Sequence, residues 1–160
     1  MNLLCVSLLV LVAVITGTLG CPSDFLGISS SCVKVVIAAG IGERPVSWKV
    51  AREGCKALGA DLAVMNVSSK VEHISAHIDK VFPNEASYTF WVGGHKVNGQ
   101  WKWVTDQTIN LKSNLWVPNT PKKDDRISFA LLVPADSLHG RRYLNENGEG
   151  GWAPGYICEI

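Results

Sequence analysis

Apolar and polar residues alternate with a helical period between positions 47 and 58 of the chain. Four apolar side chains recur at three- and four-residue spacing, at Trp48, Ala51, Cys55 and Leu58. Ser47, directly before this run, is a residue type that begins helices, and Gly59, directly after it, is the type that ends them. We therefore predict a helix over about residues 47–58 that turns Cys55 inward.

A second helical pattern follows between positions 69 and 82. Its apolar residues share one face, at Val71, Ile74, Ile78 and Val81. The helix is predicted to begin near Ser69, because Ser69 and Glu72 have the spacing of a capping box, and to end at Phe82. His73 and His77 have the four-residue spacing of helical zinc ligands, but both lie off the apolar face. We therefore predict that these histidines face solvent and hold no metal.

The remaining periodic segments are short and have the composition of strands. The pattern predicts strands at residues 33–37, 62–65, 88–92, 100–105, 127–133 and 156–159. Loops rich in proline, asparagine and glycine separate the later strands. Because the helices come early and do not alternate with the strands, the pattern indicates an α+β domain with mostly antiparallel pairing.

The first twenty residues predict a signal peptide. Residues 1–20 contain no charged side chain, hold an apolar run over residues 3–15, and end in small residues before Cys21. A membrane anchor is the alternative, but this run is shorter than the roughly 20 apolar residues that a span needs. We therefore expect a secreted, extracellular protein in which residues 21–160 form a single domain.

Charge and cysteine content argue against several classes of function. The chain has 15 Lys and Arg against 14 Asp and Glu, a formal net charge of +1, so it lacks the basic balance typical of nucleic acid binding. One of its five cysteines, Cys5, lies in the predicted signal peptide, and the others form no C-x-x-C pair. An even number of cysteines in a secreted chain favours disulfides over zinc ligation. No G-x-S-x-G motif occurs, so we expect no enzyme activity.

An ordered series of short motifs resembles the C-type lectin-like domain family. The motifs are the Trp, Ala, Cys pattern of the first helix, residues 58–63, 91–94 and 101–104, the loop residues Trp116 and Pro121, and the terminal residues 156–159. The resemblance covers residues 21–160. It implies a C-type lectin-like fold of two helices packed on mostly antiparallel sheets, with a long irregular loop region.

The resemblance also assigns the cysteines and the core. It pairs Cys21 with Cys32, and Cys55 with Cys158. A further bridge that is common in the family, and that braces the long loop region, has no counterpart in this sequence. From the same register we expect four buried residues, namely Cys55, Trp91, Val92 and Trp103.

The binding site implied by the resemblance lies in the long loop region. Calcium-dependent sugar-binding members carry Glu-Pro-Asn or Gln-Pro-Asp four residues after the loop tryptophan, and Trp-Asn-Asp on a later strand. Counting from Trp116, this chain has Thr120-Pro121-Lys122 and then Leu144-Asn145-Glu146. The peptide bond before Pro121 is expected to be cis, as in relatives. The carbohydrate-binding residues are then Thr120, Pro121, Lys122, Asn145 and Glu146.

Calcium is the cofactor that the resemblance implies. This ion takes about six to eight oxygen ligands, several of them anionic. The candidate ligands here are Asp124, Asp125, Asn145 and Glu146. Because Lys122 brings a cation to a position where the family has an oxygen, we predict only weak calcium binding. The alternative is that these residues are solvated loop charges without a metal.

Two functions follow from the resemblance. The first is a secreted C-type lectin that recognises glycans or glycoproteins, including those of microbial surfaces, in innate immunity. The second is a calcium-independent domain of the same fold that binds proteins. Asn145 and Glu146 favour the first, whereas Lys122 favours the second.

Three further features do not decide between these functions. Asn66-Val67-Ser68 is a sequon, so Asn66 is a predicted N-glycosylation site. Trp152 lies in a glycine-rich loop, where we expect it to pack within the loop rather than to present a face to sugars. Arg141 and Arg142 are predicted to form a small basic surface with His139.

Overall fold

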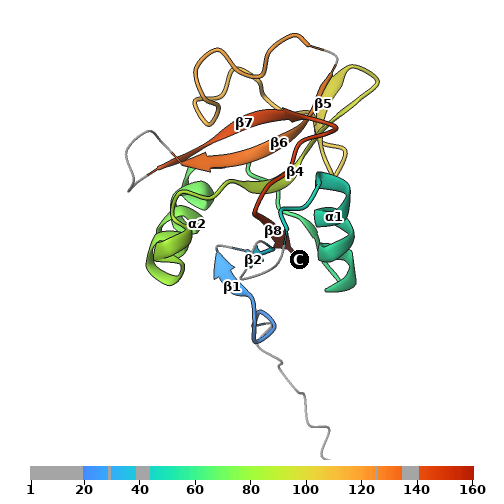
Figure 1. Ribbon diagram of the computed structural model, residues 1–160. Helices are drawn as coiled ribbons and strands as arrows, with labels where there is room; N and C mark the ends of the chain where they lie inside the picture. The colour runs from blue at the N-terminus through green and yellow to red at the C-terminus, as the bar shows by residue number, and fades with distance from the viewer. Residues whose placement is uncertain (1–19, 29, 39–43, 125, 135–140) are drawn as a thin grey trace, which may run out of the picture.

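The structure is a computed structural model that describes residues 20–28, 30–38, 44–124, 126–134 and 141–160. Its elements, in chain order, are β1 (Leu26–Ile28), β2 (Ser31–Ile37), α1 (Trp48–Ala57), β3 (Asp61–Leu62), α2 (Ser68–Val81), the 3-10 turn η1 (Pro83–Glu85), β4 (Phe90–Val97), β5 (Gln100–Trp103), β6 (Ile127–Pro134), β7 (Arg142–Gly148) and β8 (Gly155–Glu159). Neither helix in this described part of the chain has the length and apolar character needed to cross a membrane. The predicted α+β class is confirmed, with the two helices on either side of the sheet (Figure 1).

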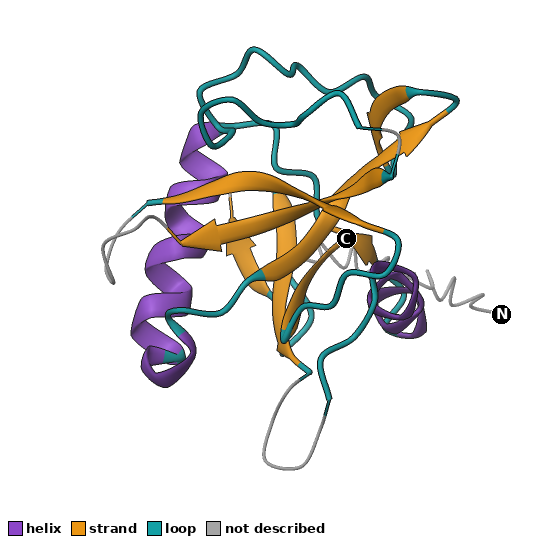
Figure 2. Ribbon diagram, turned by 45° about the horizontal axis from the view of Figure 1, so that its top comes forward, coloured by secondary structure: helices purple, strands orange, loops and turns teal. Residues whose placement is uncertain are grey.

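The described strands form one sheet, in which the last strand of the chain lies in the middle. Their order is β1-β2-β8-β4-β6-β7, with β3 beside β8 and β5 beside β4. Each pair is antiparallel except β4 with β8, where Trp91 lies opposite Tyr156 in parallel register. The segment between β5 and β6 is irregular in its described residues, 104–124 and 126, and is here called the long loop. In Figures 1 and 2 the long loop lies at the end of the molecule away from β1 and β2.

Helix α1 begins and ends at the predicted residues. The Ser47 hydroxyl accepts a hydrogen bond from the Val50 N–H at 3.4 Å and caps the first turn. After the helix, Gly59 has a φ of +73°, and the N–H groups of Gly59 and Ala60 donate to the carbonyls of Lys56 and Cys55. This pair of bonds satisfies carbonyls that the helix end leaves free, and it needs a left-handed residue, which glycine provides without strain.

Helix α2 begins one residue earlier than predicted and without the capping box. Its N-cap is Val67, whose side chain accepts no hydrogen bond, so the capping-box prediction at Ser69 was wrong. The predicted apolar face is confirmed at Val71, Ile74 and Ile78, which are buried, whereas Val81 in the last turn is half exposed. The helix is therefore held by packing of this face and not by a side-chain cap.

The two histidines of α2 differ in their surroundings. His73 is exposed as predicted, but His77 is half-buried and packs edge-on against Phe82, with ring centroids 6.2 Å apart. Burial, with a smaller contribution from Lys80, lowers the pKa of His77 below its ordinary value. The prediction that both histidines face solvent was therefore wrong for His77.

The tryptophan register that the motifs predicted is confirmed. Trp91 is 0% exposed, its indole N–H donates to the Val46 carbonyl at 2.7 Å, and its ring meets Phe129 edge-on. Trp48 donates in the same way to the Val92 carbonyl at 2.8 Å. The other residues expected in the core, Cys55, Val92 and Trp103, are also buried.

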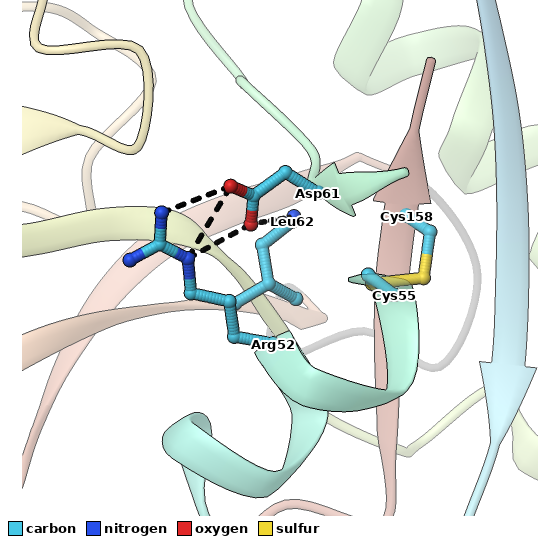
Figure 3. The surroundings of a disulfide bond; sticks show 5 residues. All are labelled: Arg52, Cys55, Asp61, Leu62 and Cys158. Atoms are coloured by element: carbon cyan, nitrogen blue, oxygen red, sulfur yellow. Dashed lines mark hydrogen bonds and ion pairs between the residues drawn. A yellow bond between two sulfur atoms is a disulfide. The ribbon is translucent and has the colours of Figure 1, made fainter. Parts of the chain in front are cut away.

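Both predicted disulfides are present. Cys21 and Cys32 are joined at an S–S distance of 2.07 Å, and Cys55 and Cys158 at 2.03 Å. The second bridge ties α1 to β8 across 103 residues of sequence. Figure 3 shows a second link from α1, where the Arg52 guanidinium donates to both carboxylate oxygens of Asp61 on β3, the strand that pairs with β8.

An ion pair fixes the other helix to the same central strand. Lys70 of α2 donates to Glu159 of β8 at 2.6 Å, and the second carboxylate oxygen of Glu159 accepts from the Val64 N–H at 2.8 Å. Both side chains are largely buried. Burial acts to raise the pKa of Glu159, but hydrogen bonds from Lys70, Ser31 and Val64 outweigh it, so the pKa lies below its ordinary value.

Replacing Glu159 with glutamine is expected to lower the free energy of unfolding at neutral pH by about 1–3 kcal/mol, as removal of a hydrogen-bonded charge does. Because the folded-state pKa is depressed, the carboxylate stabilises the fold above its unfolded-state pKa, and this stabilisation is lost as pH falls through the folded-state pKa. Denaturant titrations from neutral to acidic pH should show the gap between the two proteins closing. A gap that stays constant with pH would contradict this role, and the exposed Glu149→Gln serves as the control.

Candidate functional site

The long loop is fastened to β7 at three consecutive residues. The Leu144 N–H donates to the Leu115 carbonyl at 2.6 Å, and the Val117 N–H donates to the Leu144 carbonyl at 2.8 Å. Between them, Trp116 is 4% exposed and meets the ring of Trp101 edge-on at 5.6 Å. This pairing places the residues after Trp116 alongside the residues after Leu144, which is the juxtaposition that the sequence predicted.

A sharp turn follows at the predicted motif. Asn119 has a φ of +67°, and the peptide bond between Thr120 and Pro121 is cis, as expected. The Thr120 hydroxyl donates to the Val117 carbonyl at 2.7 Å, which orients this side chain toward its own turn. The hydroxyl oxygen keeps its lone pairs as acceptors.

Lys122 and Glu146 are brought together across the loop and strand. The Lys122 N–H donates to Glu146 Oε1 at 3.2 Å, while the exposed Lys122 side chain stands on the surface. Glu146 Oε2 is buried and has no hydrogen-bond partner among the described residues. Asn145 is half-buried, and its Oδ1 accepts from the Glu146 N–H at 2.9 Å. Of the five predicted carbohydrate-binding residues, these three therefore lie within one small region, with Pro121 next to it in the chain.

The predicted metal ligand Asp124 is already occupied by an arginine. Arg126 donates to its carboxylate from Nε at 3.1 Å, from Nη2 at 2.9 Å and from the backbone N–H at 2.9 Å. These hydrogen bonds from Arg126 lower the pKa of Asp124 to about 2. Lys96 of β4 donates to the Asp124 carbonyl at 3.0 Å, which ties this turn to the sheet.

The described residues do not make a complete calcium site. Asp125 lies outside the described residues. Of the remaining candidates, Asp124 is paired with Arg126, and Asn145 Oδ1 and Glu146 Oε1 accept backbone hydrogen bonds, which leaves Glu146 Oε2 as the one carboxylate oxygen of this set without a partner. In the part of the chain that the structure describes, no group of three or more His, Cys, Asp or Glu side chains is arranged to hold a metal. Calcium needs more anionic oxygens than these residues offer.

Trp152 is the most exposed of the large apolar side chains in the described residues. It is 63% exposed, so the expectation that it packs within its loop was wrong. The loop before it borders an open hollow of about 600 Å³, lined by Arg126, Ser128, Gly148, Glu149 and Gly150. An exposed indole face is a surface on which the apolar face of a sugar ring can stack.

Sequence reasoning missed the roles of two arginines. Arg126 pairs with the Asp124 carboxylate. The sequence signal for this pairing is that the arginine follows the aspartate by two residues in the same turn. Arg142, predicted to be part of a basic surface, is 1% exposed and pairs with Asp79 of α2 at 3.0 Å. Side chains alternate between the two faces of a strand, and Arg142 and Leu144 lie on the inward face of β7. This alternation is the sequence signal for the burial of Arg142. His139 lies outside the described residues.

Comparison with known proteins gives the family of the chain. Residues 44–136, more than half of the chain, match the family model described as Lectin C-type domain. L-selectin of Mus musculus is 28% identical over 100 residues, which cover 59% of this chain. The match covers 26% of that relative, so the chain spans about a quarter of the length of the selectins it resembles.

Solved structures show the same fold. The C-type lectin domain of murine dendritic cell inhibitory receptor 2, in complex with N-glycan, matches with a TM-score of 0.70 at 18% identity, covering 88% of this chain and 98% of that one. A calcium-independent type II antifreeze protein matches with a TM-score of 0.63 at 17% identity, covering 88% and 94%. The family match, the order of the strands and the two disulfides agree, and the chain belongs to the C-type lectin domain family.

Proposed function

We propose that this chain is a secreted lectin that binds glycans through the long-loop surface formed by Thr120, Pro121, Lys122, Asn145 and Glu146. The observation that carries the proposal is the meeting of Lys122 with Asn145 and Glu146 across the loop and strand, where the Lys122 N–H donates to Glu146 Oε1 at 3.2 Å. The amide and carboxylate groups collected here are types that exchange hydrogen bonds with sugar hydroxyls. The relative with TM-score 0.70 was solved with N-glycan, which supports a ligand of the same class.

The exposed groups around this surface suit a saccharide. Lys122 supplies hydrogen-bond donors, and the Thr120 hydroxyl can accept. A sugar has many hydroxyls that donate and accept, so mixed neighbours of this kind can fix its orientation. We propose further that the natural ligands are glycans or glycoproteins, with microbial surfaces in innate immunity as the leading source. The chain is not expected to act as an enzyme, because its family consists of binding proteins.

We propose that calcium contributes little to this binding. C-type lectin domains commonly bind Ca²⁺, but Arg126 takes up the Asp124 carboxylate and Lys122 stands at a ligand position. The paired charges of Asp124, Arg126 and Lys96 order the turn through contacts within the protein. The same observation favours the second candidate, a calcium-independent domain that binds proteins. The relative described as a calcium-independent type II antifreeze protein has this fold.

A glycan array tests the proposed function and separates it from the alternative. The protein is applied once with calcium and once with a chelator. Binding to a defined set of glycans that survives the chelator supports the proposal as stated. Binding that the chelator abolishes would assign a larger role to calcium. Failure to bind any glycan under either condition would contradict the lectin proposal and leave the protein-binding function in its place.

Replacing Lys122 with asparagine is expected to strengthen calcium binding. For the unmodified chain we expect a Kd no tighter than about 10⁻⁴–10⁻³ M, the range of weak extracellular sites. The substitution removes a positive charge from the candidate site and adds an amide oxygen, and both changes favour the cation. Isothermal titration calorimetry with calcium measures the effect.

Lys123→Asn is the matched control for this test. Lys123 is the neighbouring lysine, is also exposed, and lies outside the three-residue motif. A similar gain in both variants would point to a general charge effect and not to a ligand position. No gain in Lys122→Asn would contradict a calcium site at this turn.

The secretion of the chain remains part of the proposal. Residues 1–20 are expected to be removed in a eukaryotic secretory host, which leaves Cys21 at the new amino terminus. Mass spectrometry of the protein recovered from the culture medium checks the cleavage position. Retention of residues 1–20 on a membrane-bound product would support an anchor instead.

A further inference from the structure

Two hollows meet at Asn66, and neither includes the candidate site. The larger is about 460 Å³ and lies between the end of β8, the start of α2 and the start of the long loop. The smaller is about 150 Å³ and lies between the long loop and the segment before α2. Asn66 and Gln107 line both hollows. We call the two hollows together the Asn66 groove.

Asn66 stands at the boundary of this groove with its side chain available. It is exposed, and its amide makes no hydrogen bond to another described residue. Asn66-Val67-Ser68 is the one N-x-Ser/Thr sequence in the chain with a residue other than proline after the asparagine. Buried Met65 and the first residue of α2 enclose Asn66 and Val67, so both are held at the surface of the folded domain.

The smaller hollow has neutral walls with exposed amides. No charged residue lines it, and its lining includes Trp103, Trp116 and the amides Gln107 and Asn110. Trp116 is 4% exposed, yet its indole Nε1 has no acceptor among the described residues. This N–H is closed off from the hollow, whereas the exposed amides of Gln107 and Asn110 suit a neutral group that brings a carbonyl or hydroxyl oxygen.

The larger hollow has an apolar rim over a polar floor that is already paired. Val67 and Ile160 are 51% and 53% exposed at its edge. Lys70 and Glu159 form the floor and bind each other, so they do not call for a charged ligand. A sugar ring has apolar C–H faces and hydroxyl edges, and this combination matches an apolar rim with neutral polar neighbours.

We propose that Asn66 carries an N-linked glycan and that the first N-acetylglucosamine units of this glycan lie in the Asn66 groove. In the transfer, Asn66 Nδ2 bonds to the anomeric carbon of an oligosaccharide carried on a lipid pyrophosphate. The bond from that carbon to the pyrophosphate oxygen breaks, Nδ2 loses a proton, and the lipid pyrophosphate leaves. A host transferase supplies the catalysis, so the proposal rests on the secretion proposed above.

The attachment point determines what the glycan can cover. Because Asn66 lines both hollows, the first sugar units lie within reach of the exposed Val67 side chain and of the smaller hollow. The acetamido carbonyl of N-acetylglucosamine is an acceptor that the exposed Gln107 amide can meet, since Gln107 also lines both hollows. The glycan then shields this face and leaves the surface around Lys122 and Glu146 open to ligands.

The test uses the full chain and a version in which a host signal sequence replaces residues 1–20, both produced in cultured animal cells. Intact mass is measured before and after digestion with peptide N-glycosidase, in the unmodified chain, in Asn66→Gln and in Asn84→Gln. Asn84 is exposed and lies outside any sequon, so it is the matched control. We expect a digestible mass increase in the unmodified chain and in Asn84→Gln, and its loss in Asn66→Gln.

Hydrogen exchange then tests where the glycan lies. Amides of residues 64–70 and 103–110 should exchange more slowly in the glycosylated chain than in Asn66→Gln. In Gln107→Leu, which keeps much of the side-chain volume but lacks the amide, the glycan should remain attached and its protection of residues 103–110 should shrink.

The outcomes separate three claims, namely the modification of Asn66, the placement of the glycan in the Asn66 groove and the secretion of the chain. A secreted chain without the mass increase overturns the modification. A glycosylated chain with the same exchange as Asn66→Gln overturns the placement in the groove and leaves that face to a partner from outside. If only the version with the host signal is secreted and glycosylated, the secretion proposal fails while the Asn66 proposal stands.

Discussion

Replacing Trp91 with alanine is expected to lower the free energy of unfolding by about 3–5 kcal/mol, as truncation of large core residues does. Trp91 is 0% exposed and is the second residue of β4, which lies between β6 and β8 in the sheet. The substitution removes its edge-on contact with Phe129 and one of the two donors to the Val46 carbonyl, which keeps the Ala153 N–H. Denaturant titration followed by circular dichroism measures the loss.

Trp152→Ala is the matched control. It removes the same side chain from a position that is 63% exposed, so its effect on stability should be small. If Trp152 serves as a platform for sugars, this variant should instead weaken glycan binding at unchanged stability. Equal stability of Trp91→Ala and the unmodified protein would show that the register of β4 is wrong.

Replacing Arg142 with methionine is expected to lower the free energy of unfolding by about 3–5 kcal/mol, as the loss of one partner from a buried ion pair does. Methionine fills part of the same space but donates no hydrogen bond. Asp79 and the carbonyls of Ser75 and Ala86 would then lose the donor that they share. These contacts join α2 and the following turn to β7. Thermal and denaturant unfolding measure the change.

Arg126→Met tests whether burial causes this effect. Arg126 also pairs with an aspartate, at 2.9 Å, but its side chain is 89% exposed, against 1% for Arg142. Surface ion pairs of this kind contribute little to stability. We expect Arg126→Met to leave the unfolding midpoint almost unchanged. Similar losses in the two variants would contradict a special role for the buried arginine.

The features that the sequence predicted well depend on short-range or spacing signals. Ser47 and Gly59 are local determinants of helix ends, and both lie where helix α1 begins and ends. The cysteine pairs and the burial of Trp91 follow from the order of motifs along the chain. In these cases the residue type and its position in the chain are enough to predict the structure, because the backbone geometry of the fold requires that residue type at that position.

The predictions that failed depend on packing between distant segments. Ser69 has the local signature of a cap, but burial of Met65 and Val71 fixes how the chain enters α2, and the helix begins at Ser68. A capping preference is worth about 1 kcal/mol, which such packing can override. His77 is half-buried because Phe82, just beyond the helix, packs against it.

The candidate site shows the same division. The pairing of Leu115 and Val117 with Leu144 could be expected from the family pattern, and it brings Lys122 to Glu146. The capture of Asp124 by Arg126 was missed, because composition alone describes this turn as solvated mixed charges. Which charges pair depends on the path of the backbone, and that path is visible only in the folded loop.

The Cys55–Cys158 bridge has a mechanical consequence. The start of β2 lies beside the end of β8, with Val33 opposite Glu159, so a pull on the two ends of the domain would open this antiparallel pair one bond at a time from its outer end. Once the pair has opened, the load passes directly from Cys158 to Cys55 through the covalent link. Residues 56–157 then carry no tension, and the long loop with its candidate site would keep its shape while the rest of the chain is stretched.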